Sequence, residues 1–254
     1  MSIGFIGTGA ITEAVVSGLY TRGAYTDRIL LSRRTRERST ILAERFPQIE
    51  VISENQTLVD RCSDVFVAVL PEQASDLLDG LNFSESHRVI SLVAGLSVDA
   101  IKPLIAPATQ CFRAIPMPPI EFGFGPVPVF PPDEQLQALF ASVGDAIPVE
   151  DEARFNAFAS AGAFMATYFD FVATLAAWME EEGVEADTAA KFSSSMVHAL
   201  SKLTKRVDAE KLQKMSEACL TPGGLNEQIL HALQEEGFSD SIRDQLDKIM
   251  MRLS

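Results

Sequence analysis

The stretch that most constrains the fold of this chain is Ile3–Leu19, which reads IGFIGTGAITEAVVSGL. A short apolar run ends at Gly7, and a second glycine, Gly9, precedes a run with helical periodicity. A strand, a glycine turn and a helix in this order are typical of the first unit of a dinucleotide-binding domain. Gly7 allows a tight turn, and Gly9 lets a pyrophosphate approach the free N–H groups of the helix N-terminus. Thr12 is bulkier than the usual third residue of such turns, so a plain turn that binds nothing is the alternative.

The first half of the chain alternates short apolar runs with amphipathic segments. We predict strands near Ile3–Ile6, Ile29–Leu31, Val51–Ile52, Val65–Leu70, Val89–Val93 and Cys111–Ile115. Helical patterns lie between them, at Ile11–Tyr20, Arg36–Phe46, Gln56–Arg61, Gln73–Leu78 and Val98–Ile105. This order predicts an α/β fold, with a Rossmann-like doubly wound parallel sheet covered by helices on both faces.

The second half of the chain changes from mixed to helical patterns. The Pro- and Gly-rich stretch 115–132 does not suit a helix, and its prolines fit an edge strand or a loop. A helix at Gln135–Ser142 and a strand near Ala146–Val149 follow. Beyond residue 150 we predict helices only, at Phe155–Glu182, Asp187–Arg206, Ala209–Cys219, Asn226–Glu236 and Asp240–Arg252. We therefore expect two domains, 1–150 and 151–254, the second of them all-helical.

Composition excludes several classes of partner. The formal net charge of -14 would repel a polyanion, so we expect no nucleic acid partner. Cys62, Cys111 and Cys219 lie far apart without CxxC spacing, which predicts no metal site and a reducing, cytoplasmic location. The stretch Ala157–Met179 carries one charge, Asp170, and resembles a membrane span in length. Its small polar residues and the lack of flanking basic clusters favour burial in a subunit interface instead, so we expect no membrane.

The end of the second predicted strand indicates which dinucleotide binds. An NAD site usually ends this strand with an acidic residue that accepts hydrogen bonds from the ribose. Here the sequence continues with Ser32, Arg33 and Arg34, and six arginines fall between Arg28 and Arg45. A hydroxyl and guanidinium groups suit the 2′-phosphate of NADP(H), whereas the alternative is a basic, solvated helix start.

Several further motifs, taken in order and spacing, resemble the pyrroline-5-carboxylate reductase family over most of the chain. The opening stretch resembles that family's own, and SRRT stands where the family has Ser-Asn-Arg-Thr. VAVLPEQ, VISLVAGLSVDAI, CFRAIPMPP and TPGG resemble further family segments in the same order. The resemblance implies an NADP-binding Rossmann domain, a helical dimerisation and substrate domain, and a cytoplasmic homodimer or larger homo-oligomer. It also implies NADPH-dependent reduction of a cyclic imine, a C=N bond, in proline biosynthesis.

The resemblance also implies which residues form the site. The cofactor-binding residues would be Gly7, Thr8, Gly9, Ala10 and Ile11 at the pyrophosphate, Ser32, Arg33 and Arg34 at the 2′-phosphate and adenine, Val69, Leu70 and Pro71 at the ribose, and Ala94, Gly95 and Pro116 at the nicotinamide. The substrate-binding residues would be Met117, Gly223, Gly224, Leu225 and Asn226. A protonated cyclic imine is already electrophilic, so the sequence predicts no particular catalytic acid or base.

Departures from the family pattern fall on the substrate side. Met117 and Pro118 stand where the family has Asn-Thr, and Leu225 and Asn226 stand where it has two threonines that help to hold the substrate carboxylate. Backbone N–H groups at Gly223 and Gly224, with the Asn226 side chain, remain candidates for that carboxylate. We therefore expect an imine or keto substrate, either the family's own pyrroline-5-carboxylate or a changed one. The alternatives are a non-catalytic NADP-binding sensor or partner protein, and a β-hydroxyacid dehydrogenase-like oxidoreductase, although the lysine of that class is missing.

Overall fold

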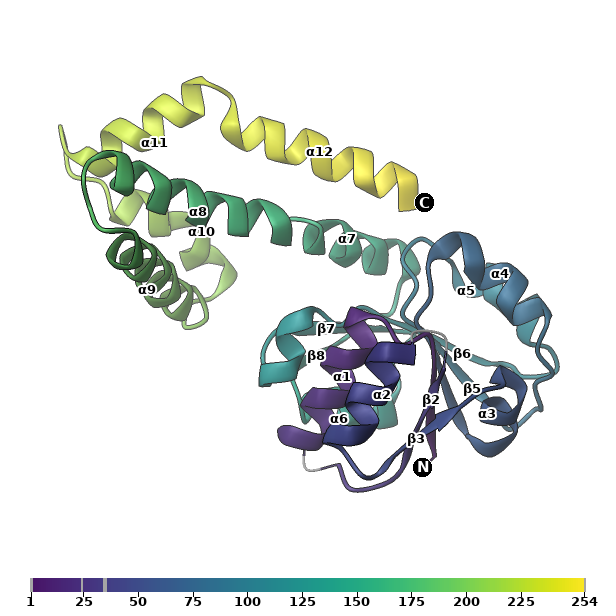
Figure 1. Cartoon of the computed structure of the whole chain (residues 1–254). Coiled ribbons are helices and arrows are strands. Elements are labelled where there is room, and N and C mark those ends of the chain that lie inside the picture. The colour runs from purple at the N-terminus through teal and green to yellow at the C-terminus, as the bar shows by residue number, and fades with distance from the viewer. Residues whose placement is uncertain (1, 24, 34–35, 254) are drawn as a thin grey trace. The chain divides into compact units, whose positions relative to one another are not determined.

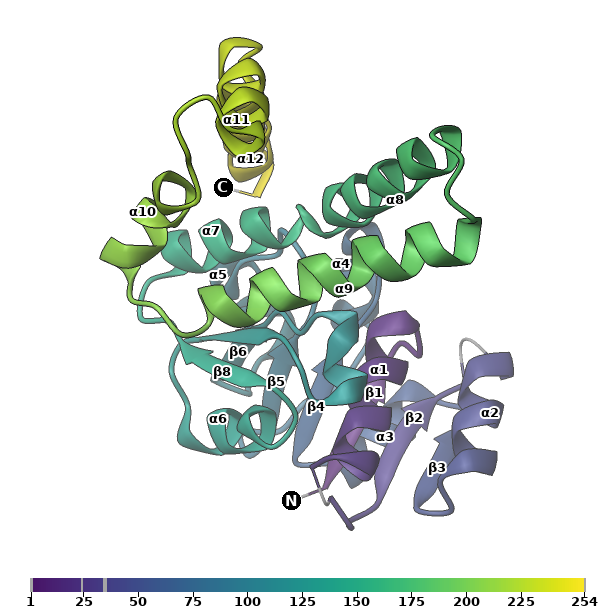
Figure 2. The same cartoon turned by 90° about the vertical axis from the view of Figure 1, so that its left-hand side faces the viewer.

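The computed structural model describes residues 2–23, 25–33 and 36–253, which form two compact units (Figures 1 and 2). The first unit consists of Met1–Ser160 and Met250–Ser254, and the second of Ala161–Ile249. The predicted boundary at residue 150 precedes the helix α7 (Glu152–Gly162), whereas the compact units divide near the end of that helix.

The first unit is built on one eight-stranded sheet with the order β3-β2-β1-β4-β5-β6-β7-β8. The strands are β1 (Ile3–Ile6), β2 (Ile29–Ser32), β3 (Ile49–Ile52), β4 (Asp64–Val67), β5 (Arg88–Ser91), β6 (Gln110–Ala114), β7 (Pro126–Phe130) and β8 (Asp145–Pro148). Neighbouring strands are parallel except for the antiparallel pair β6 and β7. The predicted Rossmann-like fold class is confirmed, with the last two strands, β7 and β8, running opposite to the other six.

Helices cover both faces of this sheet (Figures 1 and 2). They are α1 (Ala10–Thr21), α2 (Arg36–Arg45), α3 (Asn55–Arg61), α4 (Pro71–Asp79), α5 (Val98–Ile101) and α6 (Glu134–Ala141), with the 3₁₀ helices η1 (Lys102–Ile105) and η2 (Pro118–Phe122). Phe66 of β4 packs into a core with α1, α2 and α6, while Val65 and Val67 pack into a second core with α3, α4 and α5. Apolar residues therefore follow one another along β4, because both faces of the sheet are buried.

The strand β7 corrects the prediction that its prolines fit only an edge strand or a loop. This strand pairs on both sides, with β6 and β8. Pro126 and Pro128 alternate with Val127 and Val129, so the residues without an N–H all face β6. The carbonyl of Pro128 accepts from the N–H of Ile115, and Val129 accepts from Val149 on the other side. The prolines thus leave the ladder to β8 intact. The same stretch also holds η2, because proline is tolerated in the first turn of a helix.

A buried cation joins the start of α7 to the sheet of the first unit. Arg113 of β6 is 1% exposed, and its guanidinium donates to Glu152 at 2.8 Å and to Asn156 at 3.1 Å. The same Glu152 oxygen accepts from the N–H of Val98 at 2.8 Å. One carboxylate therefore holds β6, α5 and α7 together.

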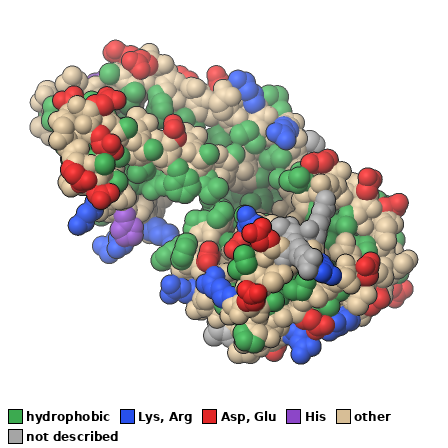
Figure 3. Space-filling model, in the orientation of Figure 1, with side chains coloured by type: hydrophobic (Ala, Val, Ile, Leu, Met, Phe, Trp, Pro, Cys, Tyr) green, Lys and Arg blue, Asp and Glu red, His purple; other side chains and the backbone are tan. Residues whose placement is uncertain are grey.

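The second unit contains α8 (Met165–Glu181), α9 (Ala186–Thr204), α10 (Ala209–Ala218), α11 (Leu225–Glu235) and α12 (Phe238–Leu253), the last of which ends in the first unit. The single helix predicted over Phe155–Glu182 is wrong, because the helix is interrupted between Gly162 and Met165. Of the described residues, one stretch, 152–181, is long and apolar enough to cross a membrane, and only 6% of its most apolar window is buried. Apolar side chains are widely exposed on the surface shown in Figure 3.

Candidate functional site

The turn between β1 and α1 contains two glycines, and a different structural feature explains each of them. Gly7 has φ +97°, and a Cβ there would overlap the carbonyl oxygen of Ala68 and lie 2.9 Å from Val69 Cγ1. Only glycine fits this backbone. Gly9 has φ -90°, and a Cβ there would meet no protein atom within 4 Å. Neither the backbone nor the packing of the chain requires glycine at this position, so the open space suits the close approach of a ligand.

Hydroxyl groups surround the first glycine of the turn. Thr12 donates to the carbonyl of Gly7 at 2.7 Å, and the N–H of Gly7 donates to the hydroxyl of Ser32 at 2.8 Å. Thr8 donates to the carbonyl of Ser32, also at 2.8 Å. The larger third residue of the motif therefore makes a hydrogen bond that glycine or alanine would not make.

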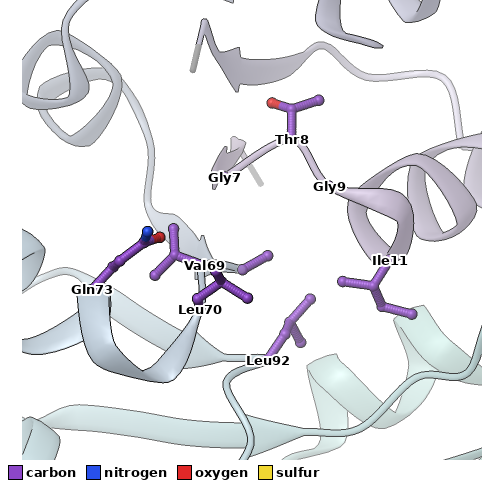
Figure 4. Close-up of a pocket in the computed structure, with 9 residues that line it drawn as sticks. Gly7, Thr8, Gly9, Ile11, Val69, Leu70, Gln73 and Leu92 are labelled. Atoms are coloured by element: carbon purple, nitrogen blue, oxygen red, sulfur yellow. The ribbon is translucent and has the colours of Figure 1, made fainter. Parts of the chain in front are cut away.

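A cavity of about 410 Å³ opens beside this turn (Figure 4). Its lining residues come from the carboxyl ends of three parallel strands and from the helices that follow them: Gly7, Thr8, Gly9, Ile11, Ala68, Val69, Leu70, Gln73 and Leu92. The strand order changes direction here, since β1 has β2 on one side and β4 on the other. Ligands of open α/β sheets bind at such a switch point.

Two helix N-termini give this cavity a positive electrostatic character. Gly9 is the N-cap of α1 and Leu70 is the N-cap of α4, and no side-chain hydrogen bond caps either helix. Pro71, at the first position of α4, has no N–H to satisfy. The described lining residues include no acidic side chain. Uncapped N–H groups and the helix dipole favour an anion. Because Val69, Leu70 and Leu92 are apolar, the opposite wall suits an uncharged ring.

The predicted cofactor residues divide between this cavity and its surroundings. Gly7, Thr8, Gly9, Ile11, Val69 and Leu70 line the cavity, and Ala10 and Pro71 are the first residues of α1 and α4. Ser32 is buried at the end of β2, Arg33 is exposed next to it, and Arg34 lies outside the described residues. Ala94 and Gly95 follow β5 and Pro116 follows β6, at the same edge of the sheet but outside the described cavity lining.

Sequence reasoning missed three lining residues: Ala68, Gln73 and Leu92. Ala68 and Leu92 directly follow the ends of β4 and β5. That position at the carboxyl end of a parallel strand was a usable signal. Gln73 lies in the first turn of α4, and its side chain is drawn toward the cavity in Figure 4.

The predicted substrate residues of the second unit form a turn whose hydrogen-bond donors already have acceptors nearby in the chain. The N–H of Gly223 donates to the Glu227 carboxylate at 2.7 Å, and the N–H of Gly224 donates to the carbonyl of Thr221 at 2.7 Å. The Asn226 amide donates to the carbonyl of Cys219 at 3.1 Å, and Leu225 is 84% exposed. Glu227 thus occupies the place that a ligand carboxylate would take at Gly223. Met117, in the first unit, is partly buried and precedes η2.

Comparisons with known proteins agree with this arrangement. The family described as "NADP oxidoreductase coenzyme F420-dependent" matches residues 2–95, and "Pyrroline-5-carboxylate reductase dimerisation" matches residues 152–254. The pyrroline-5-carboxylate reductase of Vibrio alginolyticus is 24% identical, over 98% of this chain and 95% of its own length. The Streptococcus pyogenes 1-pyrroline-5-carboxylate reductase structure has a TM-score of 0.87 at 21% identity, covering 100% of this chain and 98% of that one. The Plasmodium falciparum enzyme, solved with NADP bound, also has a TM-score of 0.87, at 16% identity, covering 100% and 97%.

The doubly wound sheet, the glycine turn at its switch point and the separate helical unit define a two-unit protein with a Rossmann-type domain. The match of residues 2–95 to an NADP oxidoreductase family makes the class that of the oxidoreductases. The two family matches lie in the expected order, one on each half of the chain. The chain belongs to the pyrroline-5-carboxylate reductase family, which confirms the resemblance inferred from its motifs.

Proposed function

We propose that this protein is an NADPH-dependent reductase that reduces the C=N bond of a cyclic imine. The observation that carries the proposal is the open space at Gly9, in front of an uncapped helix and at the switch point of the sheet. Membership of the pyrroline-5-carboxylate reductase family supports the reaction class. The exposed Arg33 beside β2 supports NADPH over NADH, because a guanidinium can bind a 2′-phosphate in a bidentate way.

The described residues fit the proposed cofactor. The amides at the start of α1 would hold the pyrophosphate, and Val69 and Leu70 would border the adjoining ribose. The loop with Ala94 and Gly95, and Pro116 beyond β6, would lie by the nicotinamide. When bound, NADPH supplies the hydride. The chain has to orient the imine carbon and exclude water from it.

We propose that the substrate site differs from that of the relatives at the place where a substrate carboxylate would be held. Glu227 already accepts the Gly223 N–H, and a second carboxylate there would meet like charge. Met117 and Leu225 offer no hydrogen-bond donor from their side chains. We therefore propose that an imine without a carboxylate is reduced at least as well as pyrroline-5-carboxylate.

The test is NADPH oxidation with three imines: pyrroline-5-carboxylate, piperideine carboxylate and unsubstituted pyrroline. Turnover of any of them supports the proposed reaction, and a preference for unsubstituted pyrroline supports the altered carboxylate site. Tight NADPH binding without oxidation by any imine or keto acid would instead favour a non-catalytic NADP-binding protein. A preference for keto acids would favour the β-hydroxyacid dehydrogenase-like alternative.

We propose that the protein acts as a soluble, cytoplasmic homodimer or larger homo-oligomer. The dimerisation family matches residues 152–254, and α8 has no buried residue within the chain. Phe169 is 58% exposed and Trp178 60%, which a second copy would cover. Sedimentation should therefore show a dimer or larger species without detergent, whereas a stable monomer would overturn the proposal.

A further inference from the structure

Both main-chain groups of Gly7 are held by side-chain hydroxyls. Its N–H donates to Ser32 Oγ at 2.8 Å, and its carbonyl accepts from Thr12 Oγ1 at 2.7 Å. Thr8, the next residue, donates to the carbonyl of Ser32 at 2.8 Å. Gly7 follows the last residue of β1, so side chains continue the hydrogen bonding where the strand ends.

These three hydroxyls come from three different places in the chain and share one buried location. Thr8 lies in the turn, Thr12 in the first turns of α1, and Ser32 is the last residue of β2. Their exposures are 1%, 0% and 2%. A buried hydrogen bond to a backbone group costs free energy when it is lost, because the freed group has no water to replace its partner. The three hydroxyls, which we call the turn latch, therefore restrict the turn to one conformation.

That conformation is the one that leaves space for a ligand. With Gly7 fixed at φ +97°, Gly9 opens to the cavity and α1 presents its uncapped N-terminus. A turn that is fixed before the ligand arrives does not lose conformational entropy on binding. The latch is thus placed to raise cofactor affinity by fixing the turn before the cofactor binds.

We propose that Thr12 and Ser32, together with Thr8, are positioning residues that hold the pyrophosphate turn ready for the cofactor. The inference rests on the proposed function, in which NADPH binds at this turn. It assigns Ser32 a role different from the one that the family resemblance implies. Ser32 acts on the turn, which is common to NADH and NADPH, and recognition of the 2′-phosphate is left to the exposed Arg33.

Substitutions at Thr12 test the latch directly. Thr12→Val keeps the shape of the side chain and removes its hydroxyl, whereas Thr12→Ser keeps the hydroxyl. We expect Thr12→Val to raise the Kd of NADPH about tenfold, which corresponds to about 1.4 kcal/mol. Thr12→Ser should stay within about threefold of the wild type, because the bond to the Gly7 carbonyl remains.

A matched control lies at the other end of the same helix. Thr21 donates to the carbonyl of Ser17 at 2.7 Å, the same kind of bond at the same length. Thr21→Val should leave the Kd of NADPH unchanged. In the protein without cofactor, hydrogen exchange over residues 7–12 should be faster in Thr12→Val than in the wild type, Thr12→Ser or Thr21→Val. If Thr12→Val does not fold, Ser32→Ala, which removes the acceptor of the Gly7 N–H, provides a second comparison outside the cavity lining.

The alternative role of Ser32, recognition of the 2′-phosphate, is tested by measuring the binding of both NADH and NADPH. Ser32→Ala should weaken the binding of NADH and of NADPH by the same factor, while Arg33→Gln should weaken the binding of NADPH alone. The proposal is overturned if Ser32→Ala weakens only NADPH, or if Thr12→Val binds NADPH as tightly as the wild type. Failure of the proposed function gives a different result, since the wild-type protein itself would then bind no NADPH.

Discussion

The two glycines of the turn should respond in opposite ways to the same substitution. Gly7 requires glycine for the fold, since its φ is positive and a Cβ would overlap the backbone of Ala68. Gly9 has an ordinary φ of -90° and open space in front of it. We predict that Gly7→Ala mainly destabilises the protein, while Gly9→Ala mainly removes cofactor binding.

The magnitudes follow from the local geometry. At Gly7, a side chain in the left-handed region costs about 1–2 kcal/mol. Relief of the backbone overlap costs a further amount, on the order of 1–3 kcal/mol. At Gly9, alanine is a poorer N-cap by about 0.5–1 kcal/mol. That loss is offset by the reduced entropy of the unfolded chain, about 0.4–1 kcal/mol. The stability of Gly9→Ala should therefore lie close to that of the wild type.

Two measurements on the same samples separate the glycines. Urea unfolding without cofactor gives the free energy of unfolding, and fluorescence titration with NADPH gives the Kd. We expect Gly9→Ala to keep the unfolding midpoint of the wild type and to raise the Kd at least tenfold, about 1.4 kcal/mol. A Gly9→Ala protein that binds NADPH normally would refute the reasoning that the space at Gly9 belongs to the cofactor. A Gly7→Ala protein as stable as the wild type would refute the packing argument.

Three further predictions concern charge and thiols. Glu152→Ala should lower the free energy of unfolding by about 3 kcal/mol, since it takes the main partner from the buried Arg113; a loss below 1 kcal/mol in urea unfolding would contradict this. Burial raises the pKa of the Cys62 and Cys111 thiols to about 12 each, so a thiol reagent at pH 8 should label the exposed Cys219 first and the other two only after denaturation. For the same reason, the stability that these two thiols contribute is complete below the unfolded thiol pKa of about 8.5 and falls as the pH rises toward 12. The free energy of unfolding should fall by about 1.4 kcal/mol per pH unit for each thiol. Unfolding curves in alkaline buffers measure this loss, and constant stability over that range would contradict it.

Much of the fold could be predicted because its signals are local. The apolar strands at Ile3–Ile6 and Ile29–Leu31 and the helix after Gly9 follow from periodicity within a few residues. The errors lie where segments that are far apart in the sequence decide the structure. Pro126 and Pro128 look like edge residues until β8 pairs on the side of β7 that keeps its N–H groups.

The candidate site divides in the same way. The sequence identified the glycine turn and the carboxyl end of β4, because a turn motif and a strand end are visible in a short stretch. It did not show that Ser32 faces Gly7, since 25 residues separate them along the chain. It left the Gly223 N–H as a candidate donor to a carboxylate, and it did not show that the Glu227 side chain accepts from that N–H in the folded chain.

By itself, then, the sequence determined the kind of fold and the place of the glycine turn, because glycine conformations and hydrophobic periodicity act over neighbouring residues. Only the tertiary structure decided which hydrogen-bonding groups are already engaged and which are open. Thr12 is an imperfect motif residue in the sequence, and in the folded chain its hydroxyl holds Gly7. A buried donor takes the partner that folding places beside it, and the order of residues along the chain does not specify that partner.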